Sequence, residues 1–269
     1  MKKIMYTLAA IALLSACGAK DKENNKEGGA DSTATETKEE GVKEDGSILD
    51  PAKDDLSKAI TTTQLIKSMS AYYGKTVQMI VYPTVYVDQE KCKQDMSGTA
   101  TPDGSETAVA INFTTVPDLA IAKGKPYILK GKITEIGYWS ELKVTEAELK
   151  PVEGESKTSA FNPKAISGDV VYNTQDIINS IKAWDKKVIT VTGDYWGTTT
   201  SKSADGKKLL EERVDLQLPG DEQKVGCSFA AEGAAKELQP SQKNVSIQGE
   251  VDYKMHYGAP YLLNCKIVK

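Results

Sequence analysis

Cysteine is the residue type with the most specific chemistry in this sequence, and one of the four cysteines stands near the N-terminus. Cys17 follows an apolar run from residue 4 to residue 14, and Lys2 and Lys3 precede that run. A positive start, a short apolar stretch and small residues before a cleavage point are typical of a secretory signal, and this apolar part is too short to span a bilayer. The sequence therefore predicts an exported protein.

The run Leu14-Ser15-Ala16-Cys17 resembles the end of a bacterial lipoprotein signal. The resemblance implies that residues 1–16 are removed and that Cys17 is acylated as the mature N-terminus. Acyl chains contribute about 0.8 kcal/mol per buried CH₂, so several chains would hold the protein on a lipid bilayer. The alternative is an ordinary signal with an incidental cysteine. Gly18, rather than Asp, follows Cys17, and this favours the outer over the inner membrane of a bacterial cell envelope, facing the periplasm or the surface.

The sequence contains few residues that could catalyse a reaction. His256 is the only histidine, so a metal site with two or more histidines is excluded. Gly-x-Ser-x-Gly, Walker A and dinucleotide-binding motifs are absent, and the carboxylates stand in solvated runs. We expect no catalytic residue, no metal and no cofactor, and hence a binding protein and not an enzyme.

Charge and composition separate a tether from the rest of the chain. The net charge is −4, and residues 18–54 hold 11 acidic residues against six lysines. This segment is almost free of apolar residues, so residues 17–54 are predicted to be a disordered acidic tether. Residues 55–152 and 171–269 each contain as many positive as negative side chains, and Arg213 is the only arginine. The charge pattern argues against nucleic acid as the partner, because nucleic-acid binders carry basic patches.

The remainder of the chain is an internal repeat. Residues 111–113 match 227–229, and residues 125–133 match 243–251. The copies are separated by a linker at 153–170 that is rich in Pro, Gly, Ser and Lys. We therefore expect two tandem domains, 55–152 and 171–269.

Each copy begins with a predicted helix and continues with strands. Apolar residues recur at three- and four-residue steps after Thr61 and after Thr174. In the second copy five alternating runs follow, and a short Ala/Glu/Lys stretch separates the third from the fourth. Five strands with that connection are the plan of an OB-fold, a small Greek-key barrel. The predicted fold is mainly β, with two five-stranded OB-fold barrels, each preceded by a short helix.

The second copy resembles the tRNA-anticodon-like OB-fold family found in exported bacterial proteins. The matching segments are residues 186–193, 225–229, 243–249 and 262–268. The first copy resembles it less, since it lacks both cysteines and the glycine at the end of the first strand. The resemblance implies a fold and no catalytic motif.

Aromatic residues gather in the loops that flank the ligand-binding face of an OB-fold. The candidate ligand-binding residues are Tyr138, Trp139, Tyr195, Trp196, Tyr253 and Tyr257. They could stack on bases, sugars or a protein, or they could close the open ends of the barrels.

Cys227 and Cys265 lie on the third and fifth predicted strands of the second copy, which are neighbours in an OB-fold. Adjacent strands can supply the separation that a disulfide needs. Two buried thiols are the alternative.

The sequence as a whole predicts a lipid-anchored envelope protein that binds a protein or a glycan, with single-stranded nucleic-acid binding as the alternative.

Overall fold

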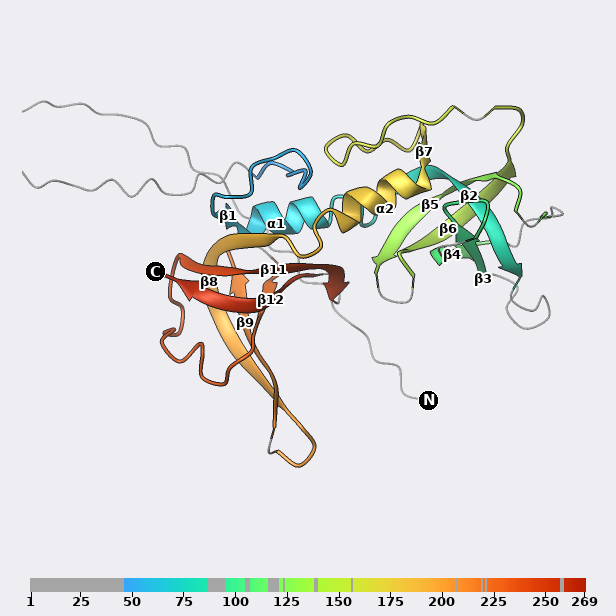
Figure 1. Cartoon of the computed structure of the whole chain (residues 1–269). Helices are drawn as coiled ribbons and strands as arrows, with labels where there is room; N and C mark the ends of the chain where they lie inside the picture. Colours follow the sequence, from blue (N-terminus) through green and yellow to red (C-terminus); the bar gives the residue numbers. More distant parts are fainter. Residues whose placement is uncertain are drawn as a thin grey trace, which may run out of the picture. The chain divides into compact units, whose positions relative to one another are not determined.

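A computed structural model describes residues 46–269 except 87–94, 105–106, 116–120, 123, 138–139, 156, 207, 219, 221 and 257–258. The described part is mainly β, as predicted. It contains two five-stranded barrels and two short helices (Figure 1). None of the described helices is long and apolar enough to cross a membrane.

The second barrel has OB-fold topology. Its strands are β8 (Val188–Lys202), β9 (Leu209–Gln217), β10 (Val225–Phe229), β11 (Val245–His256) and β12 (Ala259–Val268). They pair in the order β8-β11-β12-β10-β9, and β9 pairs with β8 to close the ring. The pairing of β10 with β12 is parallel and the other pairings in the ring are antiparallel. This is the closed Greek-key arrangement that the sequence predicts.

The first barrel repeats this topology. Its strands are β2 (Thr76–Tyr86), β3 (Asp95–Thr99), β4 (Thr107–Phe113), β5 (Tyr127–Ile136) and β6 (Leu142–Pro151). They pair in the order β3-β4-β6-β5-β2, and β2 pairs with β3 to close the ring, with β4 and β6 parallel. The internal sequence repeat is thus a repeat of the OB-fold.

Alternation of buried and exposed side chains fills both barrel interiors. On β5, Leu129 and Ile133 are fully buried while Lys130 between them is exposed. On β9, Val214 and Leu216 are fully buried while their neighbours are half-buried. Successive side chains of a strand point to opposite faces, so each strand contributes one row to a core and one row to the surface.

One glycine in each barrel lets its fourth and fifth strands approach closely. A Cβ added to Gly131 would lie 2.5 Å from Val144 Cγ1, and one added to Gly249 would lie 2.7 Å from Cys265 Sγ. The pairing register shifts at both glycines, between Lys130 and Lys132 and between Gln248 and Glu250. Glycine in a strand allows such a bend and such an approach.

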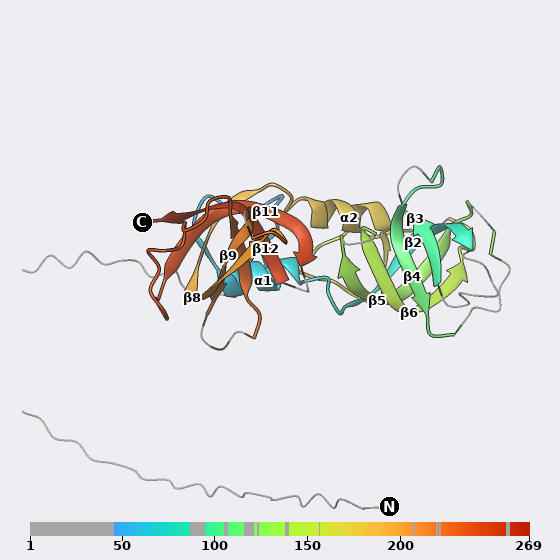
Figure 2. The same ribbon diagram turned by 90° about the horizontal axis from the view of Figure 1, so that it is seen from below.

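The two helical segments are exchanged between the barrels. β1 (Ile60–Thr61) and α1 (Thr62–Met69) precede the first barrel, but β1 pairs with β8 and α1 packs on β8, β9 and β12 of the second barrel. β7 (Val171–Asn173) and α2 (Thr174–Lys182) precede the second barrel, but they pair and pack with β2 of the first. Figures 1 and 2 show α1 beside the strands of the second barrel and α2 beside those of the first.

The first residue of each helix is fitted to the barrel that the helix covers. Thr62, in α1, lies close to Gly193 of β8. A Cβ added to Gly193 would be 2.5 Å from Thr62 Cγ2. Thr174, in α2, donates a hydrogen bond from its hydroxyl to the Ile80 carbonyl of β2. Thr61 caps α1 in a capping box with Gln64. These contacts fix each helix on the barrel of the other copy, which the repeat pattern does not reveal.

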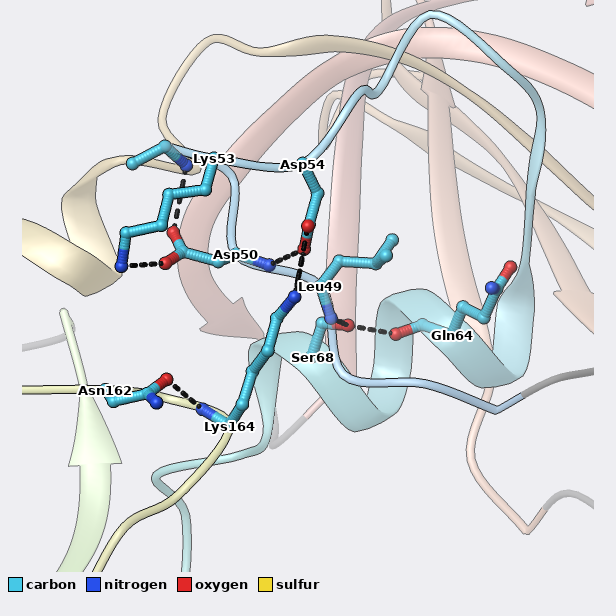
Figure 3. A network of polar contacts seen from close by, with 9 residues as sticks. Leu49, Asp50, Lys53, Asp54, Gln64, Ser68, Asn162 and Lys164 are labelled. Carbon is cyan, nitrogen blue, oxygen red and sulfur yellow. Dashed lines mark hydrogen bonds and ion pairs between the residues drawn. The ribbon is translucent and has the colours of Figure 1, made fainter.

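The segment before α1, residues 46–54, contacts the helix and is predicted as the end of the tether. The Leu49 amide donates to Ser68 Oγ at 2.8 Å. Asp50 is buried and paired with Lys53 at 3.0 Å, and Asp54 pairs with Lys164 at 2.7 Å (Figure 3). Residues 49–54 therefore make contacts with α1 and the linker, and the disordered tether at 17–54 stays a prediction.

The linker between the barrels also packs. Phe161 stacks on Tyr72 with ring centroids 5.7 Å apart and contacts Tyr172 edge-on at 5.2 Å. The Ser159 amide donates to the Val171 carbonyl at 2.8 Å. The linker therefore contributes to the junction of the exchanged segments, and the domain limits at 55–152 and 171–269 stay a prediction.

Candidate ligand-binding face

Strand β9 presents a row of charged side chains on the outside of the second barrel. Alternate side chains of β9 point outward and are half-buried: Glu211, Arg213 and Asp215. The side chains of Val214 and Leu216, which alternate with them, point into the core. Strands two and three of an OB-fold form its ligand-binding face, and β9 and β10 hold those positions here. The only arginine of the chain thus lies on that face.

Tyr261 lies flat against this face because its neighbour on β10 is a glycine. Gly226 is opposite both Asp215 and Tyr261 in the pairing. A Cβ on Gly226 would be 2.7 Å from two ring carbons of Tyr261 and 3.3 Å from Arg213 Cδ. Any larger residue at position 226 would push the Tyr261 ring off the strand. Glycine therefore creates the space in which an aromatic ring and an arginine stem lie side by side.

The Arg213 guanidinium is oriented by a carboxylate on its own strand. Arg213 Nε lies 3.0 Å from Asp215 Oδ1 in an ion pair. A guanidinium has five N–H donors in a planar fork. A single carboxylate oxygen cannot accept from all of them. The pair therefore places a carboxylate beside the guanidinium and leaves donor capacity for a ligand.

Trp196 borders the same face. It is the extra residue of a bulge in β8, where Tyr195 is opposite Leu216 and Gly197 is opposite Asp215. The Trp196 side chain is 64% exposed, and the Lys224 ammonium lies 4.2 Å from its ring centroid. A lysine over a tryptophan ring is a cation–π contact worth roughly 0.5–1 kcal/mol at an exposed site. A bulge re-aims a side chain, and here it turns a large aromatic ring toward solvent.

A hollow of about 510 Å³ lies on the barrel surface beside Lys224, and Trp196 lines a separate, neighbouring hollow with Tyr195. Arg213, Lys224, Gly226, Pro260 and Tyr261 line the first of these hollows. Carboxylates also line it, from Glu211, Asp215 and Glu222. We call the side chains of Arg213, Lys224 and Tyr261, with Gly226 beneath and Trp196 at the border, the Arg213 face. The Arg213 face combines the exposed indole ring of Trp196 and the half-buried guanidinium of Arg213 with the Tyr261 ring, which is largely buried, so it can stack on a flat group and pair with an anion.

Of the predicted aromatic residues, the structure brings Trp196 to this face and places two others elsewhere. Tyr195 is partly buried against the core, and its hydroxyl bonds that of Thr198 at 2.8 Å. The Tyr253 hydroxyl donates to Glu141 Oε2 at 3.0 Å, in the first barrel. Burial, and then the bond to Glu141, raise the pKa of Tyr253. Tyr253 therefore joins the barrels and is not on the Arg213 face.

The other predicted site residues lie outside the described part of the chain. These residues are Cys17, Tyr138, Trp139 and Tyr257. Sequence reasoning missed Arg213, Lys224 and Gly226 as members of the site. The alternation Glu211-x-Arg213-x-Asp215 on a predicted second strand was the signal that could have identified Arg213.

Cys227 and Cys265 are buried free thiols in the structure. Burial, and then hydrogen bonding to Cys265, raise the pKa of Cys227 well above its ordinary value. The structure thus contains the alternative of two buried thiols, and the disulfide between them stays a prediction. Within the described residues no group of three or more His, Cys, Asp or Glu side chains could hold a metal ion.

Comparisons with known proteins find similarity of structure alone. No family and no curated protein matches the chain. A Klebsiella pneumoniae structure described as a "putative nucleic acid-binding lipoprotein" is 18% identical, with a TM-score of 0.29, and the match covers 34% of this chain and 77% of that one. A murine DNA binding protein bound with double-stranded DNA is 10% identical, with a TM-score of 0.21 and coverages of 72% and 96%. A Replication Protein A heterotrimer bound to single-stranded DNA is 9% identical, with a TM-score of 0.22 and coverages of 73% and 48%.

At these TM-scores the fold assignment rests on the strand order of the barrels and not on the matches. The prediction that nucleic acid is an unlikely partner is corrected here, since the matched structures are described as proteins bound with or bound to DNA. The face is itself not basic, since it holds three carboxylates against two cations, but stacking on aromatic rings does not require an excess of positive charge. In the second barrel the only arginine, a lysine and two aromatic rings share one face although the domain is neutral.

Proposed function

We propose that the second barrel binds single-stranded nucleic acid through the Arg213 face. The observation that carries the proposal is the Tyr261 ring beside the Arg213 stem over Gly226, with the Trp196–Lys224 pair at the border. Aromatic rings stack on the faces of successive bases, and each stacked base contributes about 1–3 kcal/mol. Cations beside the rings can pair with the phosphates that join those bases.

The carboxylates on the face shape the kind of binding that we expect. Glu211, Asp215 and Glu222 offset the two cations. Binding should therefore depend on stacking more than on phosphate contacts. For a single strand each phosphate contact contributes about −0.7 to the slope of log K against log salt, so two cations would give a slope of about −1.4, and the three carboxylates should make it shallower than that.

We also propose that the protein acts at a membrane without catalysis of its own. The proposal rests on the sequence of residues 1–17, which resembles a lipoprotein signal with Cys17 as the acylated residue. Membership of the tRNA-anticodon-like OB-fold family is part of the same proposal. Replacing Cys17 by Ser should abolish labelling with a palmitate analogue and release the protein into the aqueous phase of a detergent partition. Equal labelling of both forms would contradict the anchor.

The nucleic-acid proposal is tested by fluorescence anisotropy with an end-labelled oligothymidylate and the purified protein. Trp196→Ala should weaken binding at least about fivefold, since one stacking surface is lost. Tyr73→Ala is the matched control, because Tyr73 is another exposed aromatic residue but lies outside the Arg213 face. Absence of saturable binding by the wild type would overturn the proposal, and capture of an envelope protein or glycan that requires Trp196 would replace it.

A further inference from the structure

The two OB-fold barrels can be compared position by position, because their strand registers coincide. Arg213 is opposite Ser228 across β9 and β10, and Asp95 is opposite Asn112 across β3 and β4. The sequence repeat matches Phe229 with Phe113, the residues next to Ser228 and Asn112. Asp95 therefore occupies in the first barrel the place of Arg213.

The same comparison identifies the counterparts of the two residues that form the aromatic contact. Gly226 pairs with Tyr261 across β10 and β12, and Ala110 pairs with Lys143 across β4 and β6. The second barrel thus has the pair Gly226 and Tyr261 at this place, and the first barrel has the pair Ala110 and Lys143. An alanine at this place has the Cβ that the Tyr261 ring excludes.

The bulge residue differs as well. In β2 the register shifts between Pro83 and Val85, so Thr84 is the extra residue, as Trp196 is in β8. The Thr84 hydroxyl donates to the Ser97 carbonyl at 3.4 Å. The first barrel therefore has a small, hydrogen-bonding side chain where the second exposes an indole ring.

The polar groups of the first barrel are paired with one another on this face. Asn112 Nδ2 donates to Asp95 Oδ1 at 2.5 Å, and Lys143 Nζ lies 3.8 Å from Glu135 Oε2. The corresponding hollow measures about 230 Å³, against about 510 Å³ in the second barrel. At these strand positions the first barrel offers a carboxylate where the second offers a guanidinium.

From these four differences we infer that, at the strand positions that the structure describes in both barrels, only the second barrel offers a stacking site for a nucleic-acid base, and that Trp196, Arg213, Gly226 and Tyr261 form it. The first barrel keeps the fold but has Thr84, Asp95, Ala110 and Lys143 at the same places. The copy that forms the first barrel contributes to the second barrel structurally, because its segments β1 and α1 pack there. This inference rests on the proposed function, because it assigns that function to one of two similar barrels.

Reciprocal substitutions test the inference. The variant Trp196→Thr/Arg213→Asp/Gly226→Ala/Tyr261→Lys gives the second barrel the residues of the first, and it should reduce the affinity for oligothymidylate at least about thirtyfold, since two stacking surfaces are lost. Asp95→Ala/Lys143→Ala, the matched change in the first barrel, should alter the affinity less than twofold. If the quadruple variant unfolds, Arg213→Asp and Tyr261→Lys separately should each reduce the affinity.

Photo-crosslinking separates failure of the inference from failure of the proposed function. The intact protein is irradiated with 4-thiouridine monophosphate, a ligand that needs only one stacking site, and the modified peptides are identified by mass spectrometry. Modification confined to the second barrel supports the inference, even if the wild type fails to bind the oligomer and the proposed function falls. Equal modification of β3, β4 or β6, or loss of binding in the first-barrel variant alone, overturns the inference while the proposed function stands. No modification and no oligomer binding overturn both.

Discussion

The hydroxyl of Tyr72 lies 3.0 Å from the hydroxyl of Ser180, a residue 108 positions later in the chain. Tyr72 follows α1 and Ser180 lies in α2, so this hydrogen bond joins the two exchanged helical segments. Each barrel is completed by a strand and a helix that precede the other barrel. The two OB-folds are therefore interlocked, and their stability should not be independent.

Cleavage of the linker should leave the two halves together. A protease site placed at Gly154, which is exposed, can be cut without disturbing a strand. We expect both fragments to co-elute from a size-exclusion column and to separate only in denaturant, because β1 and α1 remain on the second barrel. A single cut that yields two separately eluting, folded barrels would contradict the exchange.

Raising the pH above 10 should destabilise the junction of the helices. Burial raises the pKa of Tyr72 to about 12, from an ordinary value of 10.0. The unfolded chain then loses this proton before the folded protein does, so stability is complete below pH 10 and falls between pH 10 and 12. Two pH units correspond to about 2.7 kcal/mol for this group.

Tyr72→Phe should be less stable than the wild type at neutral pH, since it loses the bond to Ser180. It should also lose less stability between pH 10 and 12. Urea denaturation at both ends of this range measures the difference. A parallel decline of both proteins would show that Tyr72 is not responsible.

Glu212 should stabilise the second barrel through a turn. It is a buried carboxylate that accepts hydrogen bonds from the amides of Gly233 and Ala235, the latter at 2.9 Å. Glu212→Ala leaves both amides without this acceptor and should cost about 2–4 kcal/mol, and Glu212→Gln, which retains one acceptor oxygen, should cost about half as much. Thermal unfolding of the two variants checks the order. Equal melting temperatures for Glu212→Ala and the wild type would show that the turn is held by other contacts.

The thiols of Cys227 and Cys265 should react slowly in the folded protein. Both are buried, and burial raises the pKa of Cys227, so little thiolate is present at neutral pH. In a Cys17→Ser/Cys92→Ser variant we expect iodoacetamide labelling only after unfolding. Rapid labelling of the native variant would contradict the burial, and linked peptides in unreduced digests of envelope protein would demonstrate the predicted disulfide.

The sequence predicted the barrels better than their connections. Alternating apolar residues and the repeat of residues 125–133 in 243–251 identify strands, and short-range patterns of this kind are recorded in the sequence itself. The exchange of α1 and α2 depends on which of two similar barrels each helix meets. Contacts such as Thr62 with Gly193 or Thr174 with Ile80 join distant positions, and no local pattern distinguishes them from contacts within one copy.

The candidate site was predicted in part for a similar reason. Trp196 could be recognised as an aromatic residue near a loop, but its exposure depends on a bulge that appears only in the pairing register. Arg213 and Lys224 were counted as charges of a neutral domain. Their position on one face with Tyr261 follows from the order of β9, β10 and β12 in the closed barrel.

Hydrogen exchange of the whole protein with and without saturating oligothymidylate tests the central claim most directly. If the Arg213 face binds the strand, amide protection should increase in β9, β10 and β12, around Arg213, Gly226 and Tyr261. The corresponding strands of the first barrel, β3, β4 and β6, should exchange as in the unbound protein. Increased protection confined to the first barrel, or no change in either barrel at saturation, would contradict the claim.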